Sequence, residues 1–127
     1  MAWPITIDDV VRKNETIKYI FFDVSGTLLF KPKVYINIQE VLHKNNFDIS
    51  LNELKLKHKI LSESIFFPDQ TNSEFYKLFN CELLYALGII PTEKLLNEIF
   101  SACTYLPWEK FEDTSVLKDL NIPFGII

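Results

Sequence analysis

Two short apolar runs near the ends of this 127-residue chain constrain its fold more than any other feature. The first, residues 17–22, has the sequence Ile-Lys-Tyr-Ile-Phe-Phe and is followed by Asp23, and the second occupies residues 122–127. β-Branched and aromatic runs bounded by turn-forming residues are typical of buried strands. We therefore predict an α/β fold with parallel strands at about 17–23 and 122–127 and the other elements inserted between them.

Helical periodicity dominates the sequence between the two runs. Four helices are expected, at about residues 34–46, 50–67, 72–88 and 91–103. Local signals set their boundaries. Ser50 and Glu53 form a capping box at the start of the second helix, and Asn72 or Ser73 can cap the third. Gly88 ends the third helix and Pro91 opens the fourth. A fifth, short helix capped by Asp113 should lead into the second strand.

The helical faces predict which residues are buried. The third helix should place Leu78 and Leu83 on one apolar side, and the fourth should bury Phe100 with its neighbours. His58 falls on the apolar stripe of the second helix, where a core histidine is more common than a ligand. The expected divisions are residues 1–31 (an extension with no assigned role, the first strand and its loop), 32–107 (helices) and 108–127 (helix and second strand).

Composition and charge exclude several classes of function. The net charge is −4 and the basic residues are scattered, so nucleic acid is not an expected partner. No apolar stretch approaches the roughly 18–20 residues of a membrane span, and the N-terminus does not resemble a secretory signal. Cys81 and Cys103 lie far apart without metal-site spacing. We expect a cytoplasmic protein that acts on a small molecule, in an oligomeric state that the sequence does not define.

Asp23 is the outstanding candidate for chemistry. A carboxylate directly after a buried parallel strand lies in the crevice where open α/β sheets bind their ligands. Ser25, Gly26 and Thr27 follow it, and the backbone amides of such small residues can approach an anion closely. This pattern predicts a phosphate-binding loop beside a reactive carboxylate.

The segment Phe-Phe-Asp-Val-Ser-Gly-Thr-Leu-Leu at residues 21–29 resembles the first motif of the haloacid dehalogenase superfamily, an apolar strand ending in Asp-x-Asp-Gly-Thr or a near variant. The resemblance implies a Rossmann-like core, and residues 32–107 stand where many members insert a helical cap. Residues 117–127 resemble the helix and strand that lead into the second motif of the family. The resemblance also implies that Asp23 is the nucleophile, which forms an aspartyl-phosphate with phosphate esters.

The resemblance further implies a magnesium ion, held in part by the Asp23 side chain and the Ser25 backbone carbonyl, and a phosphate faced by Ser25, Gly26 and Thr27. Ser25 departs from the family pattern. Phosphatases commonly carry a second Asp at this position, which protonates the leaving group and then activates water. A serine hydroxyl cannot act as that acid near neutral pH.

Three functions therefore stay open. The leading one is a magnesium-dependent phosphatase acting on a small phosphate ester through Asp23. The second is a carbon–halogen hydrolase that uses Asp23 without magnesium. The third is a non-catalytic fragment of the same fold, because the remaining family motifs would follow residue 127; on that reading the 127-residue chain is inactive by itself.

Overall fold

The computed structural model describes residues 17–127, which form a mixed α/β chain divided into two compact units. The helical unit is Lys31–Pro107, and the sheet unit joins Trp108–Ile127 to the described residues up to Phe30. The extension predicted at residues 1–16 lies outside the described part of the chain. No helix within residues 17–127 is long and apolar enough to cross a membrane.

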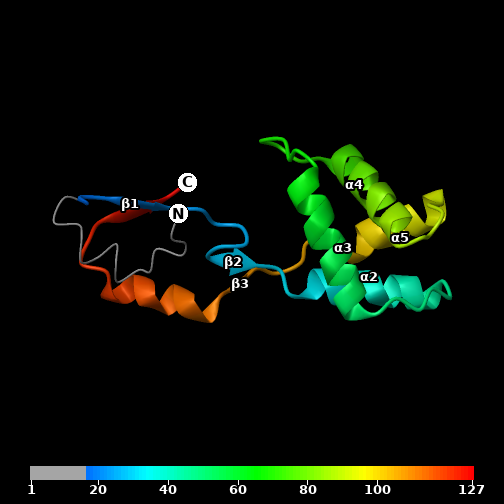
Figure 1. Cartoon of the computed structure of the whole chain (residues 1–127), viewed down its shortest axis with the longest axis horizontal. Coiled ribbons are helices and arrows are strands. Elements are labelled where there is room, and N and C mark those ends of the chain that lie inside the picture. The colour runs from blue at the N-terminus through cyan, green and yellow to red at the C-terminus, as the bar shows by residue number, and fades with distance from the viewer. Residues whose placement is uncertain (1–16) are drawn as a thin grey trace, which may run out of the picture. The chain divides into compact units, whose positions relative to one another are not determined.

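The sheet unit contains the predicted parallel pair. Strand β1 (Ile20–Phe22) runs beside the last strand, β4 (Phe124–Ile126), near the C-terminus (Figure 1). In this pair Phe21 lies opposite Gly125. The parallel pairing is thus confirmed, although both strands are shorter than predicted. Pro123 has no amide hydrogen and contributes only its carbonyl, which accepts from the Ile20 amide at 3.1 Å, so the regular ladder begins there.

A second, antiparallel pair was not predicted. Strand β2 (Leu29–Phe30) pairs with β3 (Glu109–Lys110), and the ring of Phe30 stacks on that of Phe111 with centroids 4.4 Å apart. These two-residue strands come from opposite ends of the sequence. Their pairing brings the segment after Asp23 next to the segment that precedes the last strand.

The fifth predicted helix is a 3₁₀-helix, η1 (Glu112–Asp119), and the prediction that Asp113 caps it is wrong. Asp113 lies inside the first turn, and the residue before the helix is Phe111, which offers no side-chain cap. The Phe111 carbonyl instead accepts from the Thr114 amide at 3.1 Å, three residues on, which is the tighter bonding of a 3₁₀ turn.

The helical unit contains the four predicted helices, α2 (Lys33–Lys44), α3 (Leu51–Ser64), α4 (Ser73–Ala86) and α5 (Glu93–Ala102) (Figure 1). Helices α2 and α4 each pack against both α3 and α5. Ser50 and Asn72 cap α3 and α4 by accepting from the amides three residues on, as predicted. The fourth helix does not open at Pro91, because the Thr92 hydroxyl accepts from the Leu95 amide and fixes the start at Glu93.

Two of the helices end in the same way. Gly88 after α4 has φ +75°, its amide donates to the Tyr85 carbonyl, and the next amide, of Ile89, donates to Leu84. This is the Schellman pattern, in which a left-handed residue lets the chain fold back on the last turn. Asn46 (φ +66°) does the same after α2, since asparagine tolerates this conformation better than most residues.

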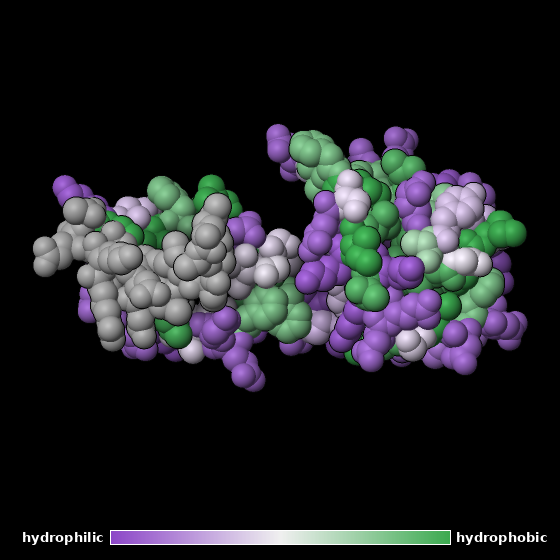
Figure 2. Space-filling model, in the orientation of Figure 1, coloured by the Kyte–Doolittle hydropathy of each residue, from purple (hydrophilic) through white to green (hydrophobic). Residues whose placement is uncertain are grey.

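The hydrophobic core belongs to the helical unit. Its buried cluster draws on all four helices and on the turn after α4: Ile38, Val41, Leu42, Leu54, Leu83, Leu84, Leu87, Ile89, Leu95, Leu96 and Ile99. Leu78 and Phe100 were expected in this core but are exposed, because the apolar arc of each helix is wider than the surface its neighbours cover. Hydrophilic side chains cover much of the helical unit in the view of Figure 2, with apolar patches between them.

Candidate active site

Asp23 directly follows β1, at the edge where β1 and β4 both end. The Ile127 amide donates to the Phe22 carbonyl at 2.9 Å, so the parallel pairing continues up to the residue before Asp23. Asp23 is exposed, and its Oδ2 accepts a hydrogen bond from the Thr27 hydroxyl at 3.1 Å. No described residue donates to Oδ1. The carboxylate of this exposed residue is therefore oriented through Oδ2 by one neighbour.

The chain reverses in a compact turn after Asp23. The Val24 carbonyl accepts from the amides of Thr27, Leu28 and Leu29 at 3.3, 2.9 and 3.0 Å, and the Gly26 amide donates to the Leu29 carbonyl at 2.8 Å. Gly26 has φ +77°, a conformation that side-chain-bearing residues rarely adopt, which explains why glycine stands at this position. In this conformation the amides of Gly26 and Thr27 bond within the turn.

Leu28 fixes the far end of the turn to the rest of the sheet unit. Its side chain is 8% exposed, the only buried hydrophobic side chain among the described residues of this unit. Its carbonyl accepts two hydrogen bonds, from the Phe111 amide and from the Thr114 hydroxyl, each 3.1 Å long. Sequence reasoning missed both donors, because 86 residues separate Thr114 from Leu28 and no local pattern links them.

The donors that the sequence proposed for a metal lie in this turn. The Asp23 carboxylate and the Ser25 carbonyl are oxygen donors, the type that magnesium prefers, and both residues are exposed. Within residues 17–127 no group of three or more His, Cys, Asp or Glu side chains is placed to hold a metal ion. These two residues would therefore supply only part of a coordination sphere.

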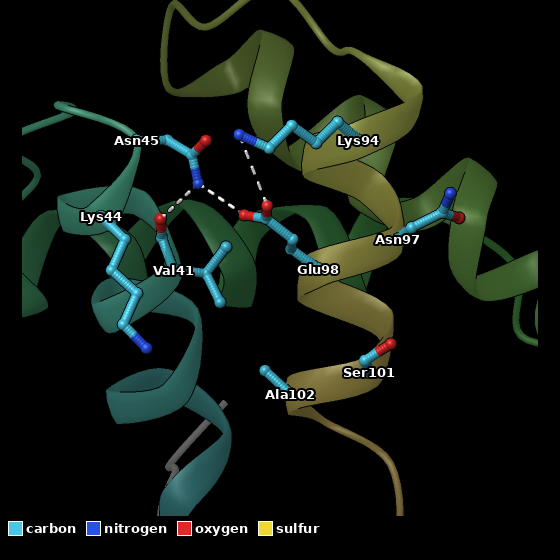
Figure 3. A pocket seen from close by; sticks show the side chains of 8 residues that line it. All are labelled: Val41, Lys44, Asn45, Lys94, Asn97, Glu98, Ser101 and Ala102. Carbon is cyan, nitrogen blue, oxygen red and sulfur yellow. Dashed lines mark hydrogen bonds and ion pairs between the residues drawn. The ribbon is translucent and has the colours of Figure 1, made fainter.

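A groove lies in the helical unit, away from these residues in the sequence. This groove of about 620 Å³ runs between α2 and α5, and Asp23 does not line it. Figure 3 shows Asn45 and Glu98 pointing toward each other across it. The Asn45 amide donates to Glu98 Oε2 at 2.7 Å, and Lys94 lies 3.7 Å from Oε1. Its central polar groups thus bind one another, which gives no reason to place a ligand there.

Three ionisable groups among residues 17–127 have pKa values shifted by burial, all in the helical unit: Tyr35, whose pKa is raised above its ordinary 10.0, His58 and Cys103. His58 packs edge-on against the rings of Tyr35 and Phe79, and the Tyr35 hydroxyl lies 3.5 Å from its Nδ1. Burial lowers the pKa of His58 below its ordinary 6.5. Burial also raises the pKa of the Cys103 thiol to about 11, although nearby Lys31 acts in the opposite direction. Cys103 is thus a thiol, not a thiolate nucleophile, at neutral pH.

Comparisons with known proteins do not assign the chain to a family. No protein-family model matches the chain, and no curated protein shows a significant match to it.

Proposed function

We propose that this chain carries the nucleophile loop of a hydrolase of the haloacid dehalogenase type, and that the protein acts on a small phosphate ester through an aspartyl-phosphate at Asp23. One observation carries the proposal. Asp23 stands exposed at the carboxyl end of a parallel strand, with the Thr27 hydroxyl 3.1 Å from Oδ2 and a glycine turn beside it.

The geometry suits in-line attack by a carboxylate. Because the Thr27 hydroxyl donates to Oδ2, the carboxylate is restrained, and Oδ1, to which no described residue donates, would attack the incoming phosphorus atom. Attack by Oδ1 would form an acyl-phosphate and break the bond from phosphorus to the ester oxygen, which would leave as an alkoxide and take its proton from water. A second water would then cleave the acyl-phosphate, releasing inorganic phosphate and regenerating the carboxylate.

Magnesium fits the donors that this loop offers. The Asp23 carboxylate and the Ser25 carbonyl would hold the ion, and water or substrate oxygens suit its remaining positions. When bound, the ion offsets the negative charges of the phosphate and the carboxylate, so that the two can approach.

Ser25 favours a second candidate, a carbon–halogen hydrolase. Halide is a good leaving group that needs no proton, so the missing acid would matter less there than with an alkyl phosphate. In that reaction Asp23 would attack carbon, halide would leave, and hydrolysis of the ester would give the hydroxy acid without magnesium. A non-catalytic role is the third candidate, also motivated by Ser25.

The test must not depend on the leaving group, because Ser25 cannot protonate one. Acetyl phosphate has a good leaving group, so incubation with magnesium should add one phosphoryl group to the peptide that contains Asp23, as read by mass spectrometry. Asp23→Asn should abolish the modification. Ser25→Asp should raise hydrolysis of an aryl phosphate by about 10²-fold, the lower end of what general acid–base catalysis contributes.

The outcomes separate the candidates. Halide release from a 2-haloacid without magnesium, lost in Asp23→Asn, would favour the carbon–halogen hydrolase. Equal behaviour of the chain and its Asp23→Asn variant toward every substrate would remove Asp23 from the chemistry and leave the non-catalytic role.

A further inference from the structure

We infer that Thr114 is a positioning residue for the Asp23 loop. It lies in η1, 86 residues after Leu28 in the sequence, and its hydroxyl donates to the Leu28 carbonyl, not to Asp23 or Thr27. Its effect passes through the peptide group that joins Leu28 to Leu29. The consequence for chemistry rests on the proposed function, whereas the effect on the loop does not.

This peptide group is held from both sides. Its carbonyl accepts from the Thr114 hydroxyl and the Phe111 amide, each at 3.1 Å. Its N–H, which belongs to Leu29, donates to the Val24 carbonyl at 3.0 Å. A peptide group is planar, so fixing the direction of its carbonyl also fixes the direction of its N–H. Thr114 therefore stabilises the bond that closes the turn.

The closed turn fixes the position of Thr27. The Val24 carbonyl that receives the Leu29 amide also receives the amides of Thr27 and Leu28, so the three donors share one anchor. From this position the Thr27 hydroxyl donates to Asp23 Oδ2 at 3.1 Å. If the Leu28–Leu29 peptide rotates, the hydrogen bonds to the Val24 carbonyl weaken. The Thr27 hydroxyl then no longer holds the Asp23 carboxylate in one orientation.

The surroundings of Thr114 strengthen the assignment. Leu28 and Thr114 are both at least partly buried, where a hydrogen bond competes less with water than it does on the exposed turn. The stacked rings of Phe30 and Phe111 hold the two segments together independently of the hydroxyl. Removing the hydroxyl should therefore loosen the turn without detaching η1.

Three variants of the whole chain test the inference. Thr114→Val removes the hydroxyl at nearly constant shape, and Thr114→Ser keeps it. Ser115→Ala is the matched control, because the Ser115 hydroxyl bonds within η1, to the Glu112 carbonyl at 2.9 Å, and does not reach the turn. Hydrogen exchange of the Leu28 and Leu29 amides, measured by NMR, reports on the turn itself.

Thr114→Val should speed exchange of these two amides roughly two- to tenfold, the effect of losing one net hydrogen bond, while amides of the helical unit are unchanged. It should slow phosphorylation of Asp23 by acetyl phosphate by a similar factor. Thr114→Ser and Ser115→Ala should behave as the unmodified chain in both measurements. Unchanged exchange in Thr114→Val, or no rescue by serine, overturns the inference. Altered exchange without any phosphorylation of the unmodified chain overturns the proposed function instead.

Discussion

Leu83 and Leu78 offer the sharpest test of how the helical unit is held together. Both lie on α4, and the sequence pattern places both on its apolar side, but Leu83 is 0% exposed whereas Leu78 is 57% exposed. The same chemical change, leucine to alanine, should therefore have very different costs at the two positions. Leu78→Ala is the matched control for Leu83→Ala.

The magnitudes follow from burial. Each change removes three side-chain carbons, and at about 0.8 kcal/mol per buried CH₂ full burial contributes roughly 2.4 kcal/mol. At Leu83 a cavity term adds to this, so the free energy of unfolding should fall by about 3–4 kcal/mol, within the range of buried Leu→Ala changes. At Leu78 less than half of the transfer term applies and no closed cavity forms, so the loss should be about 1 kcal/mol or less.

Urea unfolding followed by far-UV circular dichroism suits this test, because all four α-helices that lie within residues 17–127 belong to the helical unit. With a slope of about 1–2 kcal/mol per molar urea, Leu83→Ala should lower the midpoint by roughly 2 M, whereas Leu78→Ala should shift it by less than about 1 M. The slope itself should stay constant. Equal midpoints for the two variants would refute the assignment of Leu83 to the core and of Leu78 to the surface.

Three further predictions concern single positions. Because burial lowers the pKa of His58, the imidazole binds a proton more readily in the unfolded chain, so the free energy of unfolding should fall as pH drops below about 6.5. Urea midpoints measured over a pH series should show this decrease in the unmodified chain and in His43→Gln, but not in His58→Gln. Gly88→Ala should lower the free energy of unfolding by about 1 kcal/mol, since a Cβ there meets no atom within 4 Å and only the positive φ opposes it. A clearly larger loss in urea unfolding would mean that the Cβ clashes with a neighbouring atom. Asn72→Ala should cost about 1 kcal/mol in urea unfolding by removing the cap of α4, and an unchanged midpoint would argue against that cap.

Local signals in the sequence determined much of the fold. The cap residues Ser50 and Asn72 act on amides three residues away, and Gly88 ends α4 through bonds within its last turn. Such interactions need no distant partner, so they can be recognised from a few residues. The strand before Asp23 and the last strand were predictable for a related reason, because each lies in a short apolar run next to turn residues.

Thr92 shows where local reasoning stops. Both Pro91 and Thr92 can begin a helix, and the sequence alone favoured the proline. In the structure the threonine hydroxyl satisfies the Leu95 amide and decides the start. A similar competition explains η1, where a carbonyl–amide bond from Phe111 to Thr114 takes the place of the expected cap at Asp113.

Only the tertiary structure decided which apolar residues are core and what surrounds Asp23. Periodicity gives the direction of a side chain around its helix, but burial depends on where the neighbouring helices lie, which is why Leu78 is exposed and Leu83 is not. The strand position of Asp23 could be predicted from nine consecutive residues. The bonds that hold its loop could not, because the Leu28 carbonyl is met by donors from Phe111 and Thr114, and pairing across more than eighty residues leaves no periodic trace in the sequence.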